Sequence, residues 1–259
     1  MKRIVMPKKI IFTIEYWILV IVSVFLSSAS HATTNYANQI PDFTQTDLKG
    51  SHNGDGQQFC GPVAVSNSIV WLSNFKGEQV KLIEKLASPG YMNTSLQNGT
   101  GTTGLMNGID RIARELFKSY KRLEYQGWRK HPKRFSSAIK TPQLEWIKNG
   151  ISSDSSVWLN IGWYKYDSLQ KKYERIGGHW VTVVGHDRDA LVLHDPSPRA
   201  GKAFSNEYVQ VHRLSSGTLT GKKAGLPISA TGFHSLGKGM HLKSGADLAI
   251  IDGAVVLEL

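Results

Sequence analysis

Cys60 is the only cysteine of the chain, and its surroundings suit a nucleophile. It stands in the segment G-D-G-Q-Q-F-C-G-P-V-A, where a glycine-containing loop meets a predicted helix. The unpaired N–H groups and the dipole at a helix N-terminus stabilise a thiolate. The backbone N–H of Cys60 is also free to donate to a developing oxyanion. A buried structural thiol has no need of this position, so we interpret Cys60 as the candidate nucleophile.

A candidate base and its partner lie downstream, in I-G-G-H-W-V-T-V-V-G-H-D-R-D-A-L-V-L-H-D-P. Two apolar runs flank H-D-R-D, which predicts a β-hairpin. A turn centred on Asp187 places His179 directly opposite Asp195, and opposed side chains on one face have Cβ atoms about 4.5–5.5 Å apart. The Asp195 carboxylate would then orient the His179 imidazole and leave its other nitrogen for the thiol. A register slip of one residue would instead bring His194 or Pro196 opposite His179.

The order of Cys at a helix start, His on a strand and Asp after the next strand resembles the papain-like cysteine peptidases. C-G-P-x-A-x-x-N from Cys60 to Asn67, then G-H-W-V-x-V-x-G, then L-H-D-P, is similar to the bacteriocin-processing branch, which removes double-glycine leaders, and to its stand-alone relatives. The resemblance covers roughly residues 57–196. It implies a papain-like fold and thiol acyl chemistry on peptide bonds, with no cofactor.

The sequence departs from this family at the oxyanion-hole glutamine. The family usually places that residue further upstream of the cysteine, and Gly54 stands six positions before Cys60. Gln57 and Gln58 are the nearest candidates, and we prefer Gln57. Transporter-fused relatives also carry a nucleotide-binding domain, but no phosphate-binding glycine loop followed by Lys occurs in this sequence. The leader-cleaving export role is therefore not expected to carry over.

The pattern along the chain changes from helical to β-like. Helical spacing of apolar residues predicts helices over 61–75, 78–87 and 102–123, with a shorter one after Pro142. Runs rich in Val, Ile and aromatic residues predict strands over 156–163, 179–185, 190–194, 208–212 and 248–257. Residues 215–246 show no clear period and are interpreted as a loop. The predicted fold class is α+β, with N-terminal helices packed on a C-terminal antiparallel sheet.

Residues 1–32 are interpreted as a signal peptide. Four basic residues precede an apolar run from Trp17 to Leu26, and Ser30-His31-Ala32 offers small residues at a cleavage site. Cleavage after Ala32 would leave residues 33–259 as a single peptidase domain, secreted or periplasmic. The alternative is a retained membrane anchor, although Glu15 lies within the apolar segment. A lipid anchor is not expected, because no cysteine lies near the cut.

The chain has a formal net charge of +11, and removal of residues 1–32 leaves 27 basic and 19 acidic residues, or +8. Such a protein is attracted to anionic cell surfaces or acidic substrates. The basic residues are scattered and accompany no nucleic-acid motif, so no nucleic-acid partner is expected. The oligomeric state is left open.

A metal site is the rival from a different functional class, since His179, His186, Asp187 and His194 lie close in sequence. They lack the one-face helical spacing of zinc peptidases, and a single cysteine offers no thiolate cluster, so we expect no metal.

Three functions are consistent with these residues. The leading one is a cysteine peptidase that cleaves peptide bonds through Cys60, His179, Asp195 and Gln57. The second passes the acyl group to an amine or thiol with the same residues, as in transpeptidases. The third is a non-catalytic peptide-binding module on the same fold.

Overall fold

The computed structural model describes residues 33–46, 56–200, 207–221 and 226–259, and the contacts of His31–Leu259 form one compact unit. The predicted signal peptide, residues 1–32, lies outside the described residues. In the described part, none of the helices is long and apolar enough to cross a membrane.

The predicted helices are confirmed, with one corrected end. They are α1 (Cys60–Ser73), α2 (Gln79–Ala87), α3 (Thr102–Phe117) and α4 (Leu144–Asn149), and short 3-10 turns lie at η1 (Lys133–Phe135) and η2 (Pro198–Ala200). The prediction carried the third helix to residue 123, which is wrong. Lys118 ends it at a φ of 64°, a backbone conformation that L-residues adopt rarely and that stops helix propagation. Strand β2 (Arg122–Gly127) follows.

The predicted strands are present, and two of them are much longer than expected. The predicted runs correspond to β3 (Ser155–Asp167), β4 (Lys172–Asp187), β5 (Ala190–His194), β6 (Glu207–Arg213) and β10 (Leu248–Glu258). The short strands β1 (Thr34–Asn35), β7 (Thr218–Thr220), β8 (Ile228–Ser229) and β9 (His234–Leu236) were not predicted. The interpretation of 215–246 as a loop is therefore wrong for its described part, because strands of two or three residues leave no readable period.

The sheet closes on itself into a barrel. Strand β10 pairs with β3, β3 with β4, β4 with β5, β5 with β6, β6 with β9, and β9 again with β10. All these pairings are antiparallel, which confirms the α+β class with a largely antiparallel sheet. Strand β2 adds to the outer edge of β10, and β7 pairs with β4 in parallel. Closure gives each strand of this ring a neighbour on both sides, which the sequence pattern could not foretell.

Strands β3 and β4 are buried on both faces. Alternate residues such as Leu159 and Val181 belong to the core inside the barrel. Their neighbours Trp158 and Trp180 belong to a second core, which includes α1 and α3. Because successive strand residues point to opposite faces, one unbroken apolar run serves both cores.

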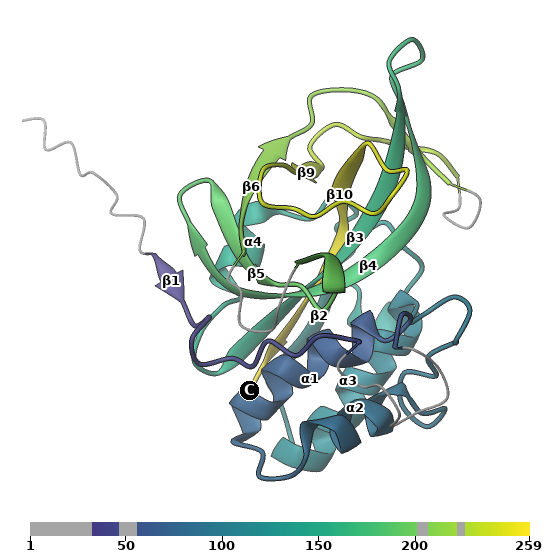
Figure 1. Cartoon of the computed structure of the whole chain (residues 1–259). Helices are drawn as coiled ribbons and strands as arrows, with labels where there is room; N and C mark the ends of the chain where they lie inside the picture. The colour runs from purple at the N-terminus through teal and green to yellow at the C-terminus, as the bar shows by residue number, and fades with distance from the viewer. Residues whose placement is uncertain (1–32, 47–55, 201–206, 222–225) are drawn as a thin grey trace, which may run out of the picture. The chain divides into compact units, whose positions relative to one another are not determined.

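Helix α1 is fixed to this outer face by specific hydrogen bonds. Trp158 Nε1 and Thr182 Oγ1 both donate to the Ala64 carbonyl, at 3.1 Å and 2.7 Å. Figure 1 shows α1, α2 and α3 gathered on one side of the strands. The start of α1 is therefore held beside the middle of the barrel wall.

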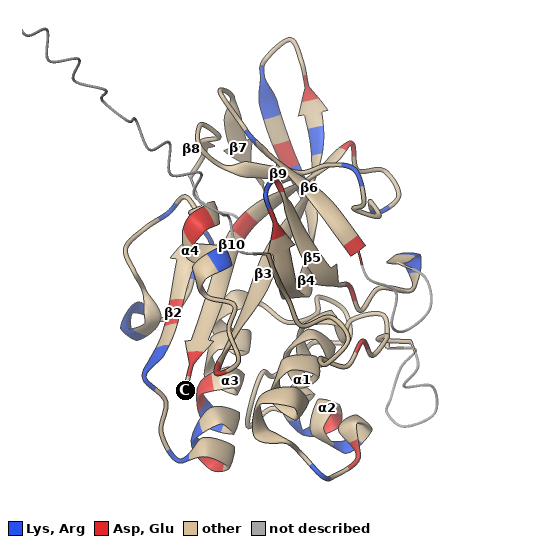
Figure 2. Ribbon diagram, turned by 90° about the vertical axis from the view of Figure 1, so that its left-hand side faces the viewer, with Lys and Arg blue, Asp and Glu red and all other residues tan. Residues whose placement is uncertain are grey.

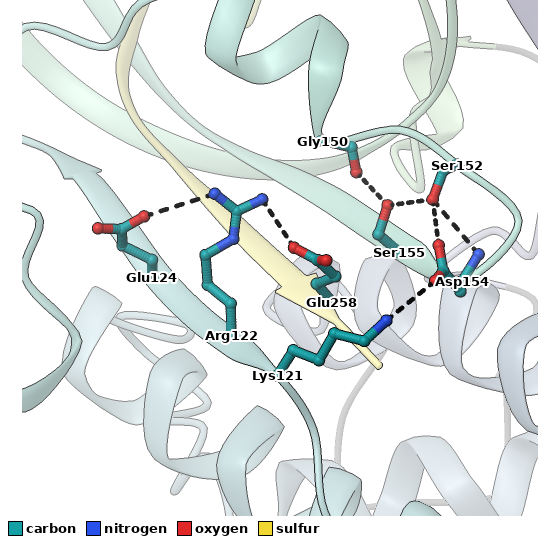
Figure 3. Close-up of polar contacts among 8 residues, drawn as sticks. All are labelled: Lys121, Arg122, Glu124, Gly150, Ser152, Asp154, Ser155 and Glu258. Atoms are coloured by element: carbon teal, nitrogen blue, oxygen red, sulfur yellow. Dashed lines mark hydrogen bonds and ion pairs between the residues drawn. The ribbon is translucent and has the colours of Figure 1, made fainter.

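A polar network joins β2, β10 and the start of β3 (Figure 3). Arg122 lies between Glu124, at 3.8 Å, and Glu258, at 3.1 Å. Ser155 Oγ donates to the Gly150 carbonyl at 2.6 Å and contacts Ser152, which also bonds Asp154. The Arg122–Glu258 pair joins β2 to β10, and Lys121, which precedes β2, reaches Asp154 at 3.4 Å and so links β2 to the start of β3.

Beyond Trp163 the β3–β4 hairpin extends past the barrel (Figure 1). Its outer part carries alternating acidic and basic residues (Figure 2), while Tyr166 and Tyr173 stack across it at 4.6 Å. The predicted strand ended at Trp163 because polar side chains replace the apolar run there.

Candidate active site

Cys60 is the first residue of α1, one position before the predicted start of the helix and at the predicted loop-to-helix junction. Phe59 is the N-cap residue and makes no side-chain capping bond, and no acidic residue occupies the first turn. The first N–H groups of a helix have no acceptor within it, so those near Cys60 can face a ligand. Gly61 lies against Thr100, and a Cβ on this glycine would come within 2.9 Å of the Thr100 Cβ. A larger residue would displace the turn that carries the thiol.

His179 is buried on β4, and its imidazole contacts three side chains. Its Nε2 lies 2.5 Å from Asp195 Oδ1. The Cys60 thiol is a second neighbour, close enough to raise the pKa of the ring, and Nδ1 is the nitrogen that Asp195 leaves available to it. Trp163 stacks on the ring, with centroids 5.7 Å apart and planes inclined by 25°. The sequence-predicted cysteine, histidine and aspartate therefore meet at one place.

The predicted register of the hairpin is wrong, although the contact it was meant to explain is present. Thr182 pairs with His194 and Val183 with Leu193, while Arg188 and Asp189 form the turn. Continued past the end of β5, this register places Val181, two residues from His179, opposite Asp195. The turn centre lies beyond Asp187, and a bulge between Val183 and Gly185 absorbs one residue.

The surroundings of His179 favour its protonated form. Burial lowers the pKa of the imidazole, but the charge and hydrogen bond of Asp195, together with the contact to Cys60, outweigh it and raise the pKa to about 10. At neutral pH the site therefore holds an imidazolium between a carboxylate and a thiol. An imidazolium beside a thiol is the charge arrangement typical of reactive cysteine sites.

A second buried carboxyl lies behind Asp195. Glu207, the first residue of β6, is 6% exposed, and its Oε1 is 3.2 Å from His241 Nε2. Burial raises the pKa of Glu207 to about 8, and the negative charges of Asp195 and Asp42 act in the same direction. Glu207 was missed from the sequence, because it carries no motif and reaches this place only through the β5–β6 pairing.

The thiol opens into a cleft of about 840 Å³. Cys60, His179 and Trp163 line it, and so do both glutamines proposed for the oxyanion hole, Gln57 and Gln58. Gln57 is exposed and Gln58 is half-buried. Because both glutamines line the cleft, the preference for Gln57 over Gln58 stays a prediction.

Gln45 also lines this cleft and was missed from the sequence. It is only 4% exposed, and its backbone N–H donates to the Pro196 carbonyl at 2.8 Å. Its side-chain Nε2 donates to the Gln57 carbonyl at 2.7 Å. Gln45 thus connects the residue after Asp195 with the loop before Cys60. The sequence hid it because fifteen positions separate it from the cysteine.

The histidines of the metal hypothesis lie in different surroundings. His179 is engaged with Asp195, His194 Nδ1 is 3.2 Å from the Pro41 carbonyl, and His186 lines a separate small cavity beside α4. Among the residues that the structure describes, no group of three or more His, Cys, Asp or Glu side chains is arranged to hold a metal ion.

Comparisons with known proteins find a similarity in fold but none in sequence. No protein-family model matches the chain, and no curated protein is significantly similar to it in sequence. Among solved structures, the fold is similar to that of a proposed C39-like peptidase from Bacillus anthracis, at a TM-score of 0.43 and 9% sequence identity. The match covers 88% of this chain and 98% of the other.

Proposed function

We propose that this chain is an exported cysteine peptidase with Cys60 as nucleophile, His179 as its acid–base partner and Asp195 as the residue that orients the imidazole. The observation that carries the proposal is the position of the His179 ring, which contacts the Cys60 thiol on one side and Asp195 Oδ1, at 2.5 Å, on the other. A nucleophile, a base and an orienting group in this order are the requirements of thiol acyl chemistry.

The reaction begins with the Cys60 thiolate and the His179 imidazolium. The sulfur attacks the carbonyl carbon of a peptide bond, and His179 gives its proton to the departing amine as the C–N bond breaks. Water, deprotonated by the now neutral imidazole, then attacks the thioester, and the acid product leaves as the proton returns to the Cys60–His179 pair. Asp195 accepts the Nε2 hydrogen bond throughout and holds the ring in place.

The oxyanion of each tetrahedral intermediate needs donors near Cys60. The backbone N–H of Cys60 is one, because it belongs to the first turn of α1. We assign the second to Gln45 rather than to Gln57, which stands closer to the cysteine in sequence. Gln45 is buried in the cleft and its Nε2 has a second proton besides the one given to Gln57, whereas the Gln57 side chain is exposed.

The test is covalent labelling followed by product analysis. Wild-type protein should react with a fluorescent electrophilic thiol probe and cleave members of a peptide library, with products identified by mass spectrometry. Cys60→Ser and His179→Ala should each lose turnover by at least about 10³-fold, and the double variant should lose little more, because the pair acts as a unit.

His186→Ala is the matched control, since His186 lies on the same strand but lines a different cavity. It should label and cleave as wild type does. Products joined to an added amine instead of water would indicate acyl transfer. Binding of peptides without any covalent adduct would contradict catalysis and favour the binding-module function.

A further inference from the structure

Cationic head groups surround the two glycines that precede His179. A Cβ on Gly178 would lie 2.3 Å from Arg175 Nη2, so the guanidinium lies directly against this glycine. A Cβ on Gly177 would lie 3.4 Å from Lys243 Nζ. The absence of side chains at these positions is what lets both cations approach the backbone beside the imidazole.

Arg175 is fixed in this position by a buried acid. Asp252, fully buried on β10, accepts from Arg175 Nε at 2.6 Å, from Tyr164 Oη at 2.5 Å and from Trp128 Nε1 at 3.0 Å. The side chain of Arg175 is only 15% exposed. A guanidinium held so rigidly presents its remaining donors in a fixed direction.

A second guanidinium, that of Arg129, lies near the same carboxylate. Arg129 lines the cleft together with Arg175. Its guanidinium carbon lies over the Trp128 ring, 5.2 Å from the ring centroid. Burial lowers the pKa of Arg129, as does the like charge of Arg175, while Asp252 raises it. Two guanidinium groups therefore line the same part of the cleft, and one of them is paired with Asp252.

The charged residues that line the cleft outside the Cys60–His179–Asp195 group are predominantly basic. They are Arg129, Arg175, Arg199, Lys243 and Glu174. Even when Asp252, the partner of Arg175, is counted together with Glu174, the basic residues of the cleft outnumber the acidic ones. A cleft with low-dielectric walls and one sign of charge concentrates ligands of the opposite sign.

One neutral group in the cleft points to a peptide ligand. Asn160 on β3 is 5% exposed, lines the cleft, and its Oδ1 has no hydrogen-bond donor among the described residues. A buried acceptor without a partner is costly unless a ligand supplies the donor. A peptide N–H would do so.

We propose that the cleft contains a carboxylate-binding subsite formed by Arg175, Arg129 and Lys243, and that the substrate is a peptide with an acidic group close to the bond that is cleaved. This inference rests on the proposed function for its substrate class. The carboxylate is either an acidic side chain or a free C-terminus, and both would make charge-assisted hydrogen bonds with the same guanidinium groups.

Binding can be measured without cleavage on full-length Cys60→Ala protein. Dye-labelled peptides of one length would carry Glu, Gln or Lys at a single position, each with a free or an amidated C-terminus, and fluorescence anisotropy would give Kd. We expect a carboxylate to tighten binding at least about tenfold over its uncharged counterpart, with a smaller gain at high salt. A gain from Glu identifies a side chain as the source, and a gain only from the free terminus identifies the C-terminal carboxylate.

Lys243→Gln and Arg129→Gln, introduced into the Cys60→Ala protein, should each remove most of this preference. Lys130→Gln is the matched control, since Lys130 is exposed, follows Arg129 directly and does not line the cleft. Lys243 is also exposed, so its variant should fold even if Arg129→Gln does not.

Equal binding of all peptides, no binding of any, or a preference that survives in Lys243→Gln and in folded Arg129→Gln would overturn the subsite. Failure of the proposed function would be recognised by a different result. If wild-type protein neither labels nor cleaves while Cys60→Ala keeps the carboxylate preference, the subsite stands and the peptidase role does not.

Discussion

His179 Nε2 and Asp195 Oδ1 are 2.5 Å apart, although the two residues are not direct partners across the β4–β5 hairpin. The observed register places Asp195 diagonally from His179, two residues along the same face. Diagonal neighbours are about 7–8 Å apart at the backbone, which long or ring side chains can bridge. A shift of two residues preserves the face, whereas a shift of one would have turned the carboxylate away.

Replacement of Asp195 should separate orientation from charge. Asp195→Asn keeps an oxygen that can accept both the His179 Nε2 proton and the Ser197 N–H, which donates at 2.8 Å. We expect it to retain measurable turnover. Asp195→Ala leaves the imidazole unoriented and should lose about 10²-fold or more. Steady-state kinetics on one cleaved peptide would test this, and full activity in the alanine variant would show that another group orients the base.

The pH dependence should follow the raised pKa of His179. Asp195 and the Cys60 contact outweigh burial and bring this pKa to about 10, so the imidazolium persists through neutral pH. We expect kcat/KM to hold above pH 8 and to fall as pH approaches 10. The contribution of His179 to the free energy of unfolding should be complete below about pH 6.5, the ordinary pKa of histidine. It should be lost as the pH rises to 10.

Asp195→Asn supplies the comparison, because removal of the carboxylate charge should move both the kinetic and the stability transitions to lower pH. Chemical denaturation at several pH values measures the stability part. Coincident pH profiles for the two proteins would contradict the assigned cause.

Much of this site could be predicted because its chemistry is local. A single cysteine at a loop-to-helix junction and a histidine in an apolar run carry their signals within a few residues. The helix end at Lys118 and strand β2 were misjudged because the apolar residues of 102–123 keep a helical appearance past the point where the backbone leaves it. Local pattern decides the type of an element better than its end.

What could not be predicted depends on long-range pairing. Closure of the barrel needs β10 to pair with β3, which lies far away in the sequence. Glu207 reaches its place behind Asp195 through the pairing of β6 with β5, which no motif announces. Gln45 reaches the cleft across residues 47–55, which lie outside the described part. Spacing rules search near the cysteine and so pass over it.

Glu207 should add an ionisation near pH 8 to the behaviour of the site. Its pKa is raised by burial and by Asp195 and Asp42, with His179 opposing. His241 Nε2 lies 3.2 Å from Glu207 Oε1. Stability from this raised pKa is present below about pH 4.5 and is lost as pH rises to 8. Glu207→Gln should flatten that part of the stability profile, as measured by denaturation between pH 4 and 9. An unchanged profile would show that Glu207 ionises as an exposed acid does.

Export is tested by the N-terminus of the protein isolated from its native cells. We expect the mature chain to begin near Thr33 and to be found outside the cytoplasm, because residues 1–32 have the charge and hydropathy of a cleaved signal. Edman sequencing or intact mass would measure it. Recovery of Met1 in the membrane fraction would favour the retained anchor.

Assigning the oxyanion donor to Gln45 or to Gln57 leads to opposite predictions for their variants. If Gln45 Nε2 donates to the oxyanion, Gln45→Ala should lower kcat by about 10²–10³-fold with little change in KM, since the bond forms only in the transition state. Gln57→Ala should change kcat by less than about threefold, because the Gln57 contact with Gln45 is made by its backbone carbonyl. Gln45 also bonds the Pro196 carbonyl through its backbone, which alanine preserves, so the fold should survive.

Gln45→Glu refines the test, because it keeps the size of the side chain but replaces the Nε2 donor with a carboxylate oxygen. It should be as impaired as alanine. A large kcat loss in Gln57→Ala with normal kcat in Gln45→Ala would return the role to Gln57.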